Sequence, residues 1–184
     1  DHDLELREIR DRHANDRRTE IVANPNDIGD EDLIAEEDMV ITVTRGGYIK
    51  RTPLTEYRAQ RRGGRGKVGM TTKAEDEVWR LFVASTHATL LFFTDTGRAF
   101  TRKVYELPVV APNAKGRALV NFLAMEPDEV VETLLAIRDF SDHAESYLFF
   151  ATRQGRVKRP PLADYANIRS NGLRAVNIND DDDL

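Results

Sequence analysis

The stretch with the clearest chemical character is QRRGGRG, residues 60–66, which places three arginines and three glycines within seven positions. Arginine presents a planar fork of permanently charged donors that matches phosphate oxygens in pairs. Glycine lacks a Cβ atom, so backbone N–H groups can approach an anion closely. Gln60 adds an amide donor. The combination predicts a loop that grips a phosphate backbone, with a disordered RG-rich linker as the alternative on composition alone.

The charge of the chain is unevenly distributed. Its net charge is −5, which argues at first against a nucleic-acid partner. Residues 45–67 nevertheless carry +7, residues 98–117 carry +4 and residues 153–174 carry +5. Because screening at physiological salt acts over about 8 Å, a phosphate at one of these stretches interacts mainly with the cations beside it. The local charges therefore favour a polyanionic partner.

The basic stretches belong to a sequence repeat whose units are spaced by 50 and 58 residues. In each unit an apolar run precedes a turn glycine, an aliphatic residue and an acid follow at fixed distances, and a second glycine comes later. Spacing of this size is typical of propeller blades and other repeat arrays. The aligned sets are Gly47, Gly97 and Gly155; Leu54, Val104 and Leu162; Glu56, Glu106 and Asp164; Tyr57, Leu107 and Tyr165; and Gly66, Gly116 and Gly172.

Each repeat predicts short antiparallel β-strands. The apolar runs are six to eight residues long, rich in Val, Ile, Leu, Phe and Thr, and bounded by glycine turns. Gly46 and Gly47 lie between two such runs and predict a hairpin, because a tight turn needs a positive φ. Further apolar runs occupy residues 78–85, 119–123 and 130–137. We expect three to four strands per repeat, with a β-sandwich of non-repeating strands as the alternative.

The two ends of the chain differ from the repeats. LELREIRDRHANDRR, residues 4–18, contains strong helix formers with a thin apolar face, which predicts a helix that needs a partner, or else a frayed tail. Residues 24–38 are acidic and rich in turn formers, so they are expected to connect the helix to the first repeat. The run Asp180–Asp183 is expected to be a solvated end rather than a cation site.

The sequence lacks the patterns of several catalytic classes. The four histidines lie in unrelated contexts without metal-binding spacing, and no nucleophile elbow or GxxxxGK[ST] phosphate loop is found. The absence of cysteine excludes disulfides and thiolate metal sites. No apolar stretch approaches the ~18–20 residues of a membrane span, and the start does not resemble a secretory signal. We therefore expect a soluble intracellular binding protein without an active site of its own.

Basic residues of the later repeats lie at similar offsets from their glycines. Lys115 and Arg117 flank Gly116, and Arg169 and Arg174 lie on either side of Gly172. If the repeats are arranged around an axis, these cations form a curved basic rim. Bending 20–30 base pairs of DNA around a rim costs of order 1–6 kcal/mol. A few charge-assisted contacts of ~1.5–3 kcal/mol each offset that cost.

QRRGGRG resembles the gyrase-A box, the signature of the C-terminal domain of the DNA gyrase A subunit. The resemblance covers essentially the whole chain, and the matching segments have the same order and spacing as in that subunit. The paralogous A subunit of topoisomerase IV shares the repeat but typically lacks an intact box, so it is the alternative family. The matching segments are DRRTEI (16–21), DEDLIAEEDMVITVTRGGYIKRTPLTEYRAQRRGGRGK (30–67), VASTH (83–87), KVYELP (103–108) and GRALVNFL (116–123).

The resemblance implies an all-β fold, a propeller-like β-pinwheel of antiparallel blades that exchange strands, with about three of the usual six blades present. It places blades near residues 39–87, 88–145 and 146–184, an acidic connector at 19–38 and the end of a helical arm at 1–18. The catalytic tyrosine and the ATPase of the family lie outside such a fragment. The fragment is thus expected to be non-catalytic and without a cofactor, while ATP and Mg²⁺ belong to the whole enzyme.

The resemblance also implies a function. Such a domain wraps duplex DNA around its basic edge without sequence preference and serves ATP-dependent negative supercoiling. The implied partners are double-stranded DNA, the remainder of the gyrase A subunit and the gyrase B subunit. The two subunits are expected to form a heterotetramer of two A and two B chains in the bacterial cytoplasm, and no membrane partner is expected. A propeller that binds an acidic protein is the alternative, and single-stranded RNA binding ranks lower because few aromatic residues lie near the box.

The residues expected to contact DNA are Gln60, Arg61, Arg62, Gly63, Gly64, Arg65, Gly66, Lys67, Lys50, Arg51, Lys115, Arg117, Lys158, Arg159, Arg169 and Arg174.

Overall fold

The computed structural model describes residues 2–13, 30–57, 76–178 and 182–184. The chain divides into two compact units, Asp1–Leu33 and Ile34–Leu184, named here the N-terminal unit and the β unit. The N-terminal unit contains the α-helix α1 (His2–His13) and the 3-10 helix η1 (Asp30–Leu33). The predicted N-terminal helix is confirmed, and its apolar side chains Leu6 and Ile9 are exposed, as the thin apolar face predicts.

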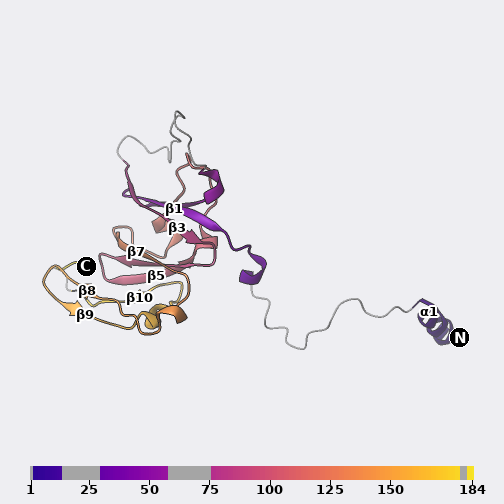
Figure 1. The fold of residues 1–184 in the computed structure, drawn as a ribbon. Coiled ribbons are helices and arrows are strands. Elements are labelled where there is room, and N and C mark those ends of the chain that lie inside the picture. Colours follow the sequence, from indigo (N-terminus) through magenta and orange to yellow (C-terminus); the bar gives the residue numbers. More distant parts are fainter. Residues whose placement is uncertain (1, 14–29, 58–75, 179–181) are drawn as a thin grey trace. The chain divides into compact units, whose positions relative to one another are not determined.

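The described part of the β unit forms three antiparallel sheets (Figure 1). Sheet 1 has the strand order β3-β1-β2-β6, sheet 2 the order β10-β5-β4-β7, and sheet 3 the pair β8-β9. The strands are β1 (Asp38–Thr44), β2 (Tyr48–Pro53), β3 (Val78–Ser85), β4 (Thr89–Thr94), β5 (Arg98–Lys103), β6 (Arg117–Ala118), β7 (Val131–Ile137), β8 (Phe150–Ala151), β9 (Val157–Lys158) and β10 (Leu173–Arg174).

Each sheet is built around one hairpin whose turn ends in a glycine with a positive φ. The angle is +77° at Gly47, +78° at Gly97 and +82° at Gly155. In each turn the glycine N–H donates to the carbonyl three residues earlier, at 2.9–3.1 Å. That carbonyl belongs to a threonine in all three repeats. The predicted hairpin at Gly46–Gly47 is therefore present, and it recurs in the other two repeats.

The repeated spacing after each turn also has a structural meaning. The aliphatic residue seven positions after the turn glycine begins a 3-10 helix in every repeat. These helices are η2 (Leu54–Glu56), η3 (Val104–Glu106) and η5 (Leu162–Tyr165), and a fourth, η4 (Ser141–His143), follows sheet 2. In η3 the repeated acid, Glu106, accepts the backbone N–H of Lys103 at 2.6 Å, which caps the turn.

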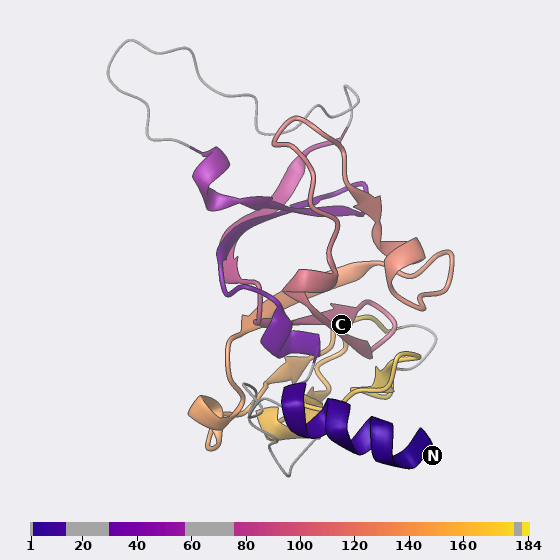
Figure 2. The same cartoon turned by 90° about the vertical axis from the view of Figure 1, so that its right-hand side faces the viewer.

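Consecutive repeats exchange a strand. The short strand β6 follows the second hairpin in sequence but pairs with β2 of sheet 1, with Ile49 opposite Arg117. In the same way β10 follows the third hairpin and pairs with β5 of sheet 2, with Ala99 opposite Leu173. Each of these two sheets is thus completed by the repeat that comes after it. This exchange and the antiparallel pairing confirm the predicted all-β pinwheel fold (Figure 2).

The later glycines of the second and third repeats fit this exchange. Gly116 has a φ of +86° and Gly172 a φ of +83°. A Cβ atom on Gly116 would lie 2.5 Å from the carbonyl oxygen of Ile49, and one on Gly172 would lie 2.7 Å from Cε1 of Phe100. The exchanged segment can therefore reach the preceding sheet only with glycine at this point.

The sheets are stacked in chain order and enclose two apolar cores. Sheets 1 and 2 share a core that includes Ile41, Val43, Leu90 and Phe92. Sheets 2 and 3 share a second core, in which Phe93 packs edge-on against Phe150 with ring centres 5.2 Å apart. Sheet 2 is apolar on both faces because it packs on sheet 1 with one face and on sheet 3 with the other.

One predicted strand is wrong. Residues 119–123 form the short helix α2 (Leu119–Phe122), with Leu123 N–H donating to the Leu119 carbonyl at 2.7 Å. Leu119 and Leu123 are both buried, whereas Asn121 is exposed. A strand would place Asn121 on the same face as the two leucines, and a helical turn directs it to solvent instead.

Candidate nucleic-acid interface

Two segments carry basic residues from one repeat onto the sheet of the preceding repeat. We name them strap 1 (residues 107–118, ending in β6) and strap 2 (residues 166–174, ending in β10). Strap 1 runs along the edge of β2 in sheet 1, where Val110 N–H donates to the Arg51 carbonyl at 3.2 Å and Arg51 N–H donates to the Pro108 carbonyl at 3.1 Å. The straps therefore decide where the cations beside Gly116 and Gly172 lie.

Strap 1 presents two cations beside aromatic rings. The Lys115 ammonium lies 3.6 Å from the centre of the Tyr48 ring, and the Arg117 guanidinium lies 5.7 Å from the centre of the Phe122 ring. Arg117 is exposed and donates to the Asn121 carbonyl at 3.0 Å, which uses part of its five-donor fork. The rings and this carbonyl hold the cations in place while further N–H donors stay available to a phosphate.

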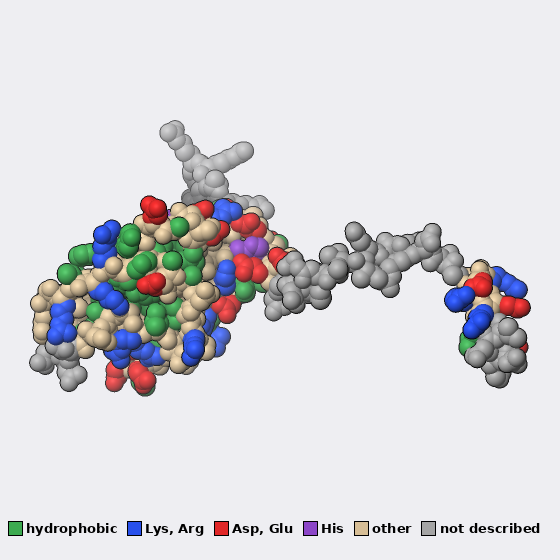
Figure 3. Space-filling view, turned by 90° about the horizontal axis from the view of Figure 1, so that it is seen from below, with side chains coloured by type: hydrophobic (Ala, Val, Ile, Leu, Met, Phe, Trp, Pro, Cys, Tyr) green, Lys and Arg blue, Asp and Glu red, His purple; other side chains and the backbone are tan. Residues whose placement is uncertain are grey.

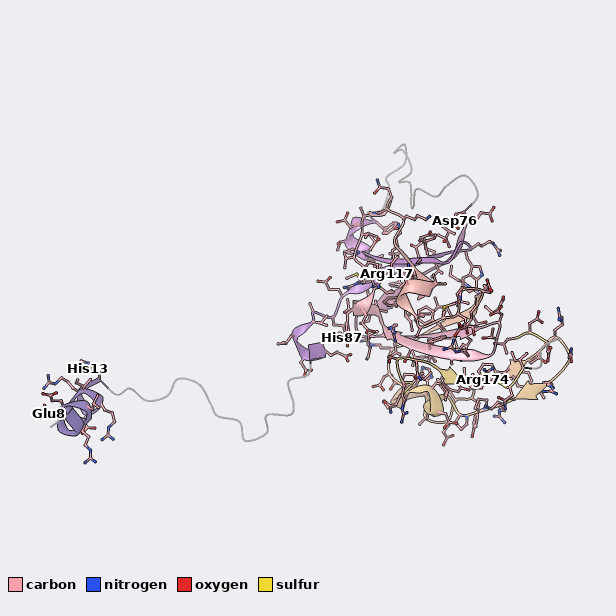
Figure 4. The ribbon with its side chains drawn as sticks, turned by 180° about the vertical axis from the view of Figure 1, so that it is seen from behind. Glu8, His13, Asp76, His87, Arg117 and Arg174 are labelled. Carbon is pink, nitrogen blue, oxygen red and sulfur yellow. The ribbon has the colours of Figure 1, made fainter. Side chains whose placement is uncertain are left out.

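Strap 2 presents Arg169 and Arg174, both exposed. Arg174 donates to the Thr96 carbonyl at 3.2 Å, at the tip of the sheet 2 hairpin. Figure 4 labels Arg117 and Arg174, which lie on successive sheets of the stack. Among the described residues, neither arginine forms an ion pair with an acid. The two arginines are not at equivalent register positions, because Arg117 lies opposite Ile49, two residues after its turn glycine, whereas Arg174 lies opposite Arg98, one residue after its own.

Sheet 3 carries the next pair of predicted residues, Lys158 and Arg159. Both are exposed. Lys158 donates to the Ala175 carbonyl at 2.6 Å, and the Arg159 guanidinium lies 4.1 Å from the centre of the Tyr147 ring. Figure 3 shows the side of the β unit nearest sheet 3, where Lys and Arg side chains lie among exposed hydrophobic ones.

The prediction is corrected for Lys50. Its side chain is fully buried, and the ammonium donates to the carbonyls of Ala111, Pro112 and Ala114, the last at 2.9 Å. Burial lowers the pKa of Lys50. The position three residues after the turn glycine lies on the sheet face turned away from the next sheet, as the equivalent Phe100 does in sheet 2. In sheet 1 that face is covered by strap 1, so this lysine fastens strap 1 and is withdrawn from a DNA surface.

Arg51 has a comparable structural role. It is half-buried, and its guanidinium donates to the carbonyls of Leu107 and Tyr105, each at 2.8 Å. Burial lowers the pKa of Arg51, and the charge of Glu37 acts in the opposite direction. Arg51 therefore stabilises the start of strap 1 with two of its five guanidinium donors.

The box itself, Gln60, Arg61, Arg62, Gly63, Gly64, Arg65, Gly66 and Lys67, lies outside the described residues. Its predicted role rests on the sequence.

Each hairpin turn is held by a carboxylate that sequence reasoning missed. Asp76 accepts the Gly46 N–H at 2.8 Å, and Asp182 accepts the Gln154 N–H at 2.9 Å. Glu129 accepts the hydroxyl of Thr96 at 2.7 Å. All three acids contact the residue just before the turn glycine. They follow that glycine by 29, 32 and 27 residues, and this variable spacing hides them from an alignment of the repeats.

The middle carboxylate is the most deeply buried. The side chain of Glu129 has no exposed surface, pairs with Arg98 at 2.9 Å and accepts the Thr94 hydroxyl at 2.6 Å. Burial by itself would raise the pKa of Glu129. The hydrogen bonds from Thr94 and Thr96, together with the N–H of Glu126 and the charge of Arg98, outweigh burial and lower it.

The expectation of a solvated acidic end is wrong for Asp182. This residue is 9 % exposed, and Asp183 next to it pairs with Arg153 at 3.3 Å. Asp182 is buried because it accepts the hydrogen bond from Gln154 at the hairpin of sheet 3. The adjacent acids in the sequence do not indicate this contact.

Other classes of site find no support in the described residues. These contain no group of three His, Asp or Glu side chains placed to hold a metal ion. No helix in the described ranges is long and apolar enough to cross a membrane.

A family model described as DNA gyrase C-terminal domain, beta-propeller, matches residues 38–85, 88–138 and 146–184. The chain belongs to this family. The three matched segments begin at β1, just before β4 and just before β8, so each holds one hairpin of the stack. The gyrase C-terminal domain repeat therefore coincides with the structural repeat.

Curated relatives of this gyrase domain include gyrase A subunits. The DNA gyrase A subunit of Mycobacterium tuberculosis is 47% identical over 180 residues, and that of Staphylococcus aureus is 47% identical over 181 residues. The alignments cover 98% of this chain. The chain spans 21% and 20% of those two relatives, about a fifth of their length.

Solved structures of the family have the same fold. The C-terminal domain of DNA topoisomerase IV aligns with a TM-score of 0.69 and 31% identity, over 82% of this chain and 45% of that one. The DNA gyrase A C-terminal domain aligns with a TM-score of 0.59 and 25% identity, over 79% of this chain and 45% of that one. Both comparisons agree with the predicted fragment of a larger gyrase-type domain.

Proposed function

We propose that this chain binds duplex DNA through its phosphate backbone and bends the duplex along the straps. The observation that carries the proposal is the repeated placement of exposed cations by strand exchange, in a member of the gyrase C-terminal domain family. Lys115 and Arg117 lie beside or on the strand that completes sheet 1, and Arg174 lies on the strand that completes sheet 2. Phosphate contacts of this kind position a duplex without selecting its sequence.

The net charge of −5 is compatible with this partner. A phosphate bound at a strap would lie within about one screening length of the strap cations, so their attraction would be little screened. Its repulsion by acids on other faces would be largely screened. Each phosphate neutralised contributes a slope of about −0.9 to log K against log salt. Several such contacts offset a bending cost of order 1–6 kcal/mol.

We further propose the setting in which this binding acts. The chain would be the DNA-wrapping part of a gyrase A subunit, within an assembly of two A subunits with two B subunits in the bacterial cytoplasm. The wrap would present a DNA segment for ATP-dependent negative supercoiling. Strand cleavage and the use of ATP and Mg²⁺ would belong to other parts of the enzyme, and this chain would contribute the path of the DNA.

Ligation of nicked minicircles tests the proposal. A wrapping protein changes the linking number that is trapped when the nick is sealed, so we expect topoisomers displaced from those of free DNA. A variant with Arg61, Arg62 and Arg65 replaced by alanine should lose most of the displacement. Arg138→Ala is the matched control, because Arg138 is exposed but already paired with Glu36 at 2.6 Å.

Two outcomes would contradict the proposal. An unchanged linking number at saturating protein would favour an adaptor that binds an acidic protein. A displacement that survives the triple substitution but is lost with Arg138→Ala would place the DNA on another face.

A further inference from the structure

A pocket with a volume of about 470 Å³ opens between sheets 1 and 2, and we name it the junction pocket. The hairpin of sheet 1, the strand β3, the start of α2 and the start of β7 form its walls. Both of these sheets have four strands. The volume falls within the roughly 300–1,000 Å³ of pockets that hold small molecules. The apolar part of the lining consists of Val43, Trp79, Leu119, Met125 and Val131.

Trp79 reaches the pocket through a bulge in β3. The register of β3 against β1 shifts between Val43 and Thr44, so Trp79 is an extra residue of the strand. Such a bulge re-aims a side chain, and here the tryptophan packs against the core shared by sheets 1 and 2. The strand β7 has the same shift against β4, but its extra residue is Glu132. The aromatic wall is therefore particular to the junction of sheets 1 and 2.

The space beside the turn glycine also differs between the two junctions. A Cβ atom on Gly97 would lie 2.9 Å from Cδ1 of Ile178, which fills this position in sheet 2. A Cβ atom on Gly47, which lines the junction pocket, would meet nothing within 4 Å. Among the described residues, the chain thus fills this space in sheet 2 and leaves it open in sheet 1.

Two exposed arginines, Arg45 and Arg80, lie at the mouth of the junction pocket. The Arg80 guanidinium lies 5.1 Å from the centre of the Trp79 ring and forms no hydrogen bond or ion pair with another described residue. Arg45 approaches Glu77 only at 3.8 Å, and both of these side chains are mostly exposed. The guanidinium of Arg80 is therefore held beside an aromatic ring with its donors available.

The acids that line the junction pocket do not cancel these charges. The carboxylate of Glu129 is already bound by Arg98 and by the hydroxyls of Thr94 and Thr96. Glu132 is exposed and brings one negative charge against two guanidinium groups. An apolar floor, an aromatic wall and an excess of positive charge at the mouth together suit an aromatic anion.

We propose that the junction pocket binds a small planar aromatic ligand that carries one carboxylate. The ring of the ligand packs on Trp79 and on the apolar floor, where it is removed from water. The carboxylate at the mouth accepts two parallel N–H donors from Arg80. Neither Trp79 nor Arg80 belongs to a strap, so this site does not rest on the proposed binding of DNA.

Titration of the chain with naphthoate in the absence of DNA tests this proposal. Trp79 is the only tryptophan in the chain, so its indole N–H gives a single cross-peak in a proton–nitrogen correlation spectrum. We expect this peak and the backbone N–H peak of Gly47 to shift together and to saturate as one site. Shifts that never saturate, or saturating shifts that leave both of these peaks in place, would overturn the proposal.

Naphthamide, a neutral ligand with the same ring, separates the contribution of the charge from that of the ring. The parent chain should bind naphthoate about tenfold more tightly than naphthamide, and Arg80→Met should bind the two alike. Binding of naphthamide by the variant also shows that its pocket is folded. Arg169→Met is the matched control, because Arg169 is an exposed arginine outside the pocket, and it should keep the tenfold preference. A preference for naphthoate that persists in Arg80→Met would refute the assignment of the carboxylate to Arg80.

Discussion

Asp182 accepts a hydrogen bond from the backbone N–H of Gln154 at 2.9 Å, across 28 residues of chain. The same relationship joins Asp76 to Gly46 in the first repeat, and Glu129 to the hydroxyl of Thr96 in the second. Figure 4 labels Asp76, which lies just before β3. A carboxylate near the end of each repeat thus binds the hairpin near the start of the same repeat. This contact links the two ends of the repeat to each other.

Removing the charge of Glu129 should weaken the β unit. Glu129→Gln leaves Arg98 without its partner in a site where the Glu129 side chain is fully buried. We expect a loss of about 2–4 kcal/mol in the free energy of unfolding. Urea unfolding followed by circular dichroism measures it, with Glu132→Gln as the control because Glu132 is exposed. Equal midpoints for the two variants would show that the ion pair contributes nothing.

The same carboxylates predict a pH dependence. The pKa values of Glu129 and Asp182 lie below their ordinary values of 4.5 and 3.8 in the folded chain. A group whose pKa is lowered by folding stabilises the fold above its unfolded pKa, and that contribution disappears as the pH falls through the folded value. The urea midpoint should therefore fall as the pH drops below about 4.5.

Glu129→Gln should reduce this dependence, because the variant has one fewer group that binds a proton on unfolding. Urea titrations at a series of pH values compare the two proteins. If the midpoints of parent and variant fall in parallel, Glu129 does not carry the effect.

Gly116 should be intolerant of any side chain. Gly116→Ala places a Cβ atom 2.5 Å from the Ile49 carbonyl oxygen at a φ of +86°, so strap 1 must move off sheet 1. Gly155 has a similar φ of +82° but open space around its Cα, which makes Gly155→Ala the control for the backbone cost alone. We expect about 1 kcal/mol for Gly155→Ala and about 3 kcal/mol for Gly116→Ala in unfolding experiments. Equal costs would mean that the close approach to Ile49 is unimportant.

The straps should determine the salt dependence of DNA binding. Replacing Arg117 and Arg174 with alanine removes one exposed cation from each of two sheets, so the slope of log K against log salt should flatten by roughly two. Fluorescence anisotropy of a labelled duplex over a range of salt concentrations measures the slope. Arg138→Ala should leave the slope unchanged, and a double variant with the parental slope would remove the straps from the DNA path.

Lys50 distinguishes structural from DNA-binding cations. Lys50→Met keeps an unbranched stem but leaves the carbonyls of Ala111, Pro112 and Ala114 without their donor. We expect a loss of about 1–3 kcal/mol in stability with the salt slope of DNA binding retained. A flatter slope at full stability would return Lys50 to the DNA surface.

Much of the architecture follows from local sequence. The hairpins are predicted by the turn glycines at 47, 97 and 155 and by the apolar runs beside them. Both signals are local, because the positive φ of a turn and the alternation of a strand depend on residues that are close together in the sequence. The expected strand at residues 78–85 is β3 itself. The prediction for residues 119–123 is wrong because an apolar run of five residues fits a strand or a helical turn equally well, and the packing of Leu119 and Leu123 selects the helix.

By itself the sequence determined the repeat, the positions of its turns and the concentration of cations in three stretches, since these depend on residues close together in the chain. Only the tertiary structure decided that β6 and β10 complete the sheets of the preceding repeats, that Lys50 is buried beneath strap 1 while Arg117 stays exposed, and that Asp182 is buried. These outcomes depend on contacts between distant residues, such as Asp182 with Gln154 and Lys50 with Ala114, 64 residues apart. No local sequence pattern predicts these contacts, because the partner of each side chain depends on how segments far apart in the sequence pack together.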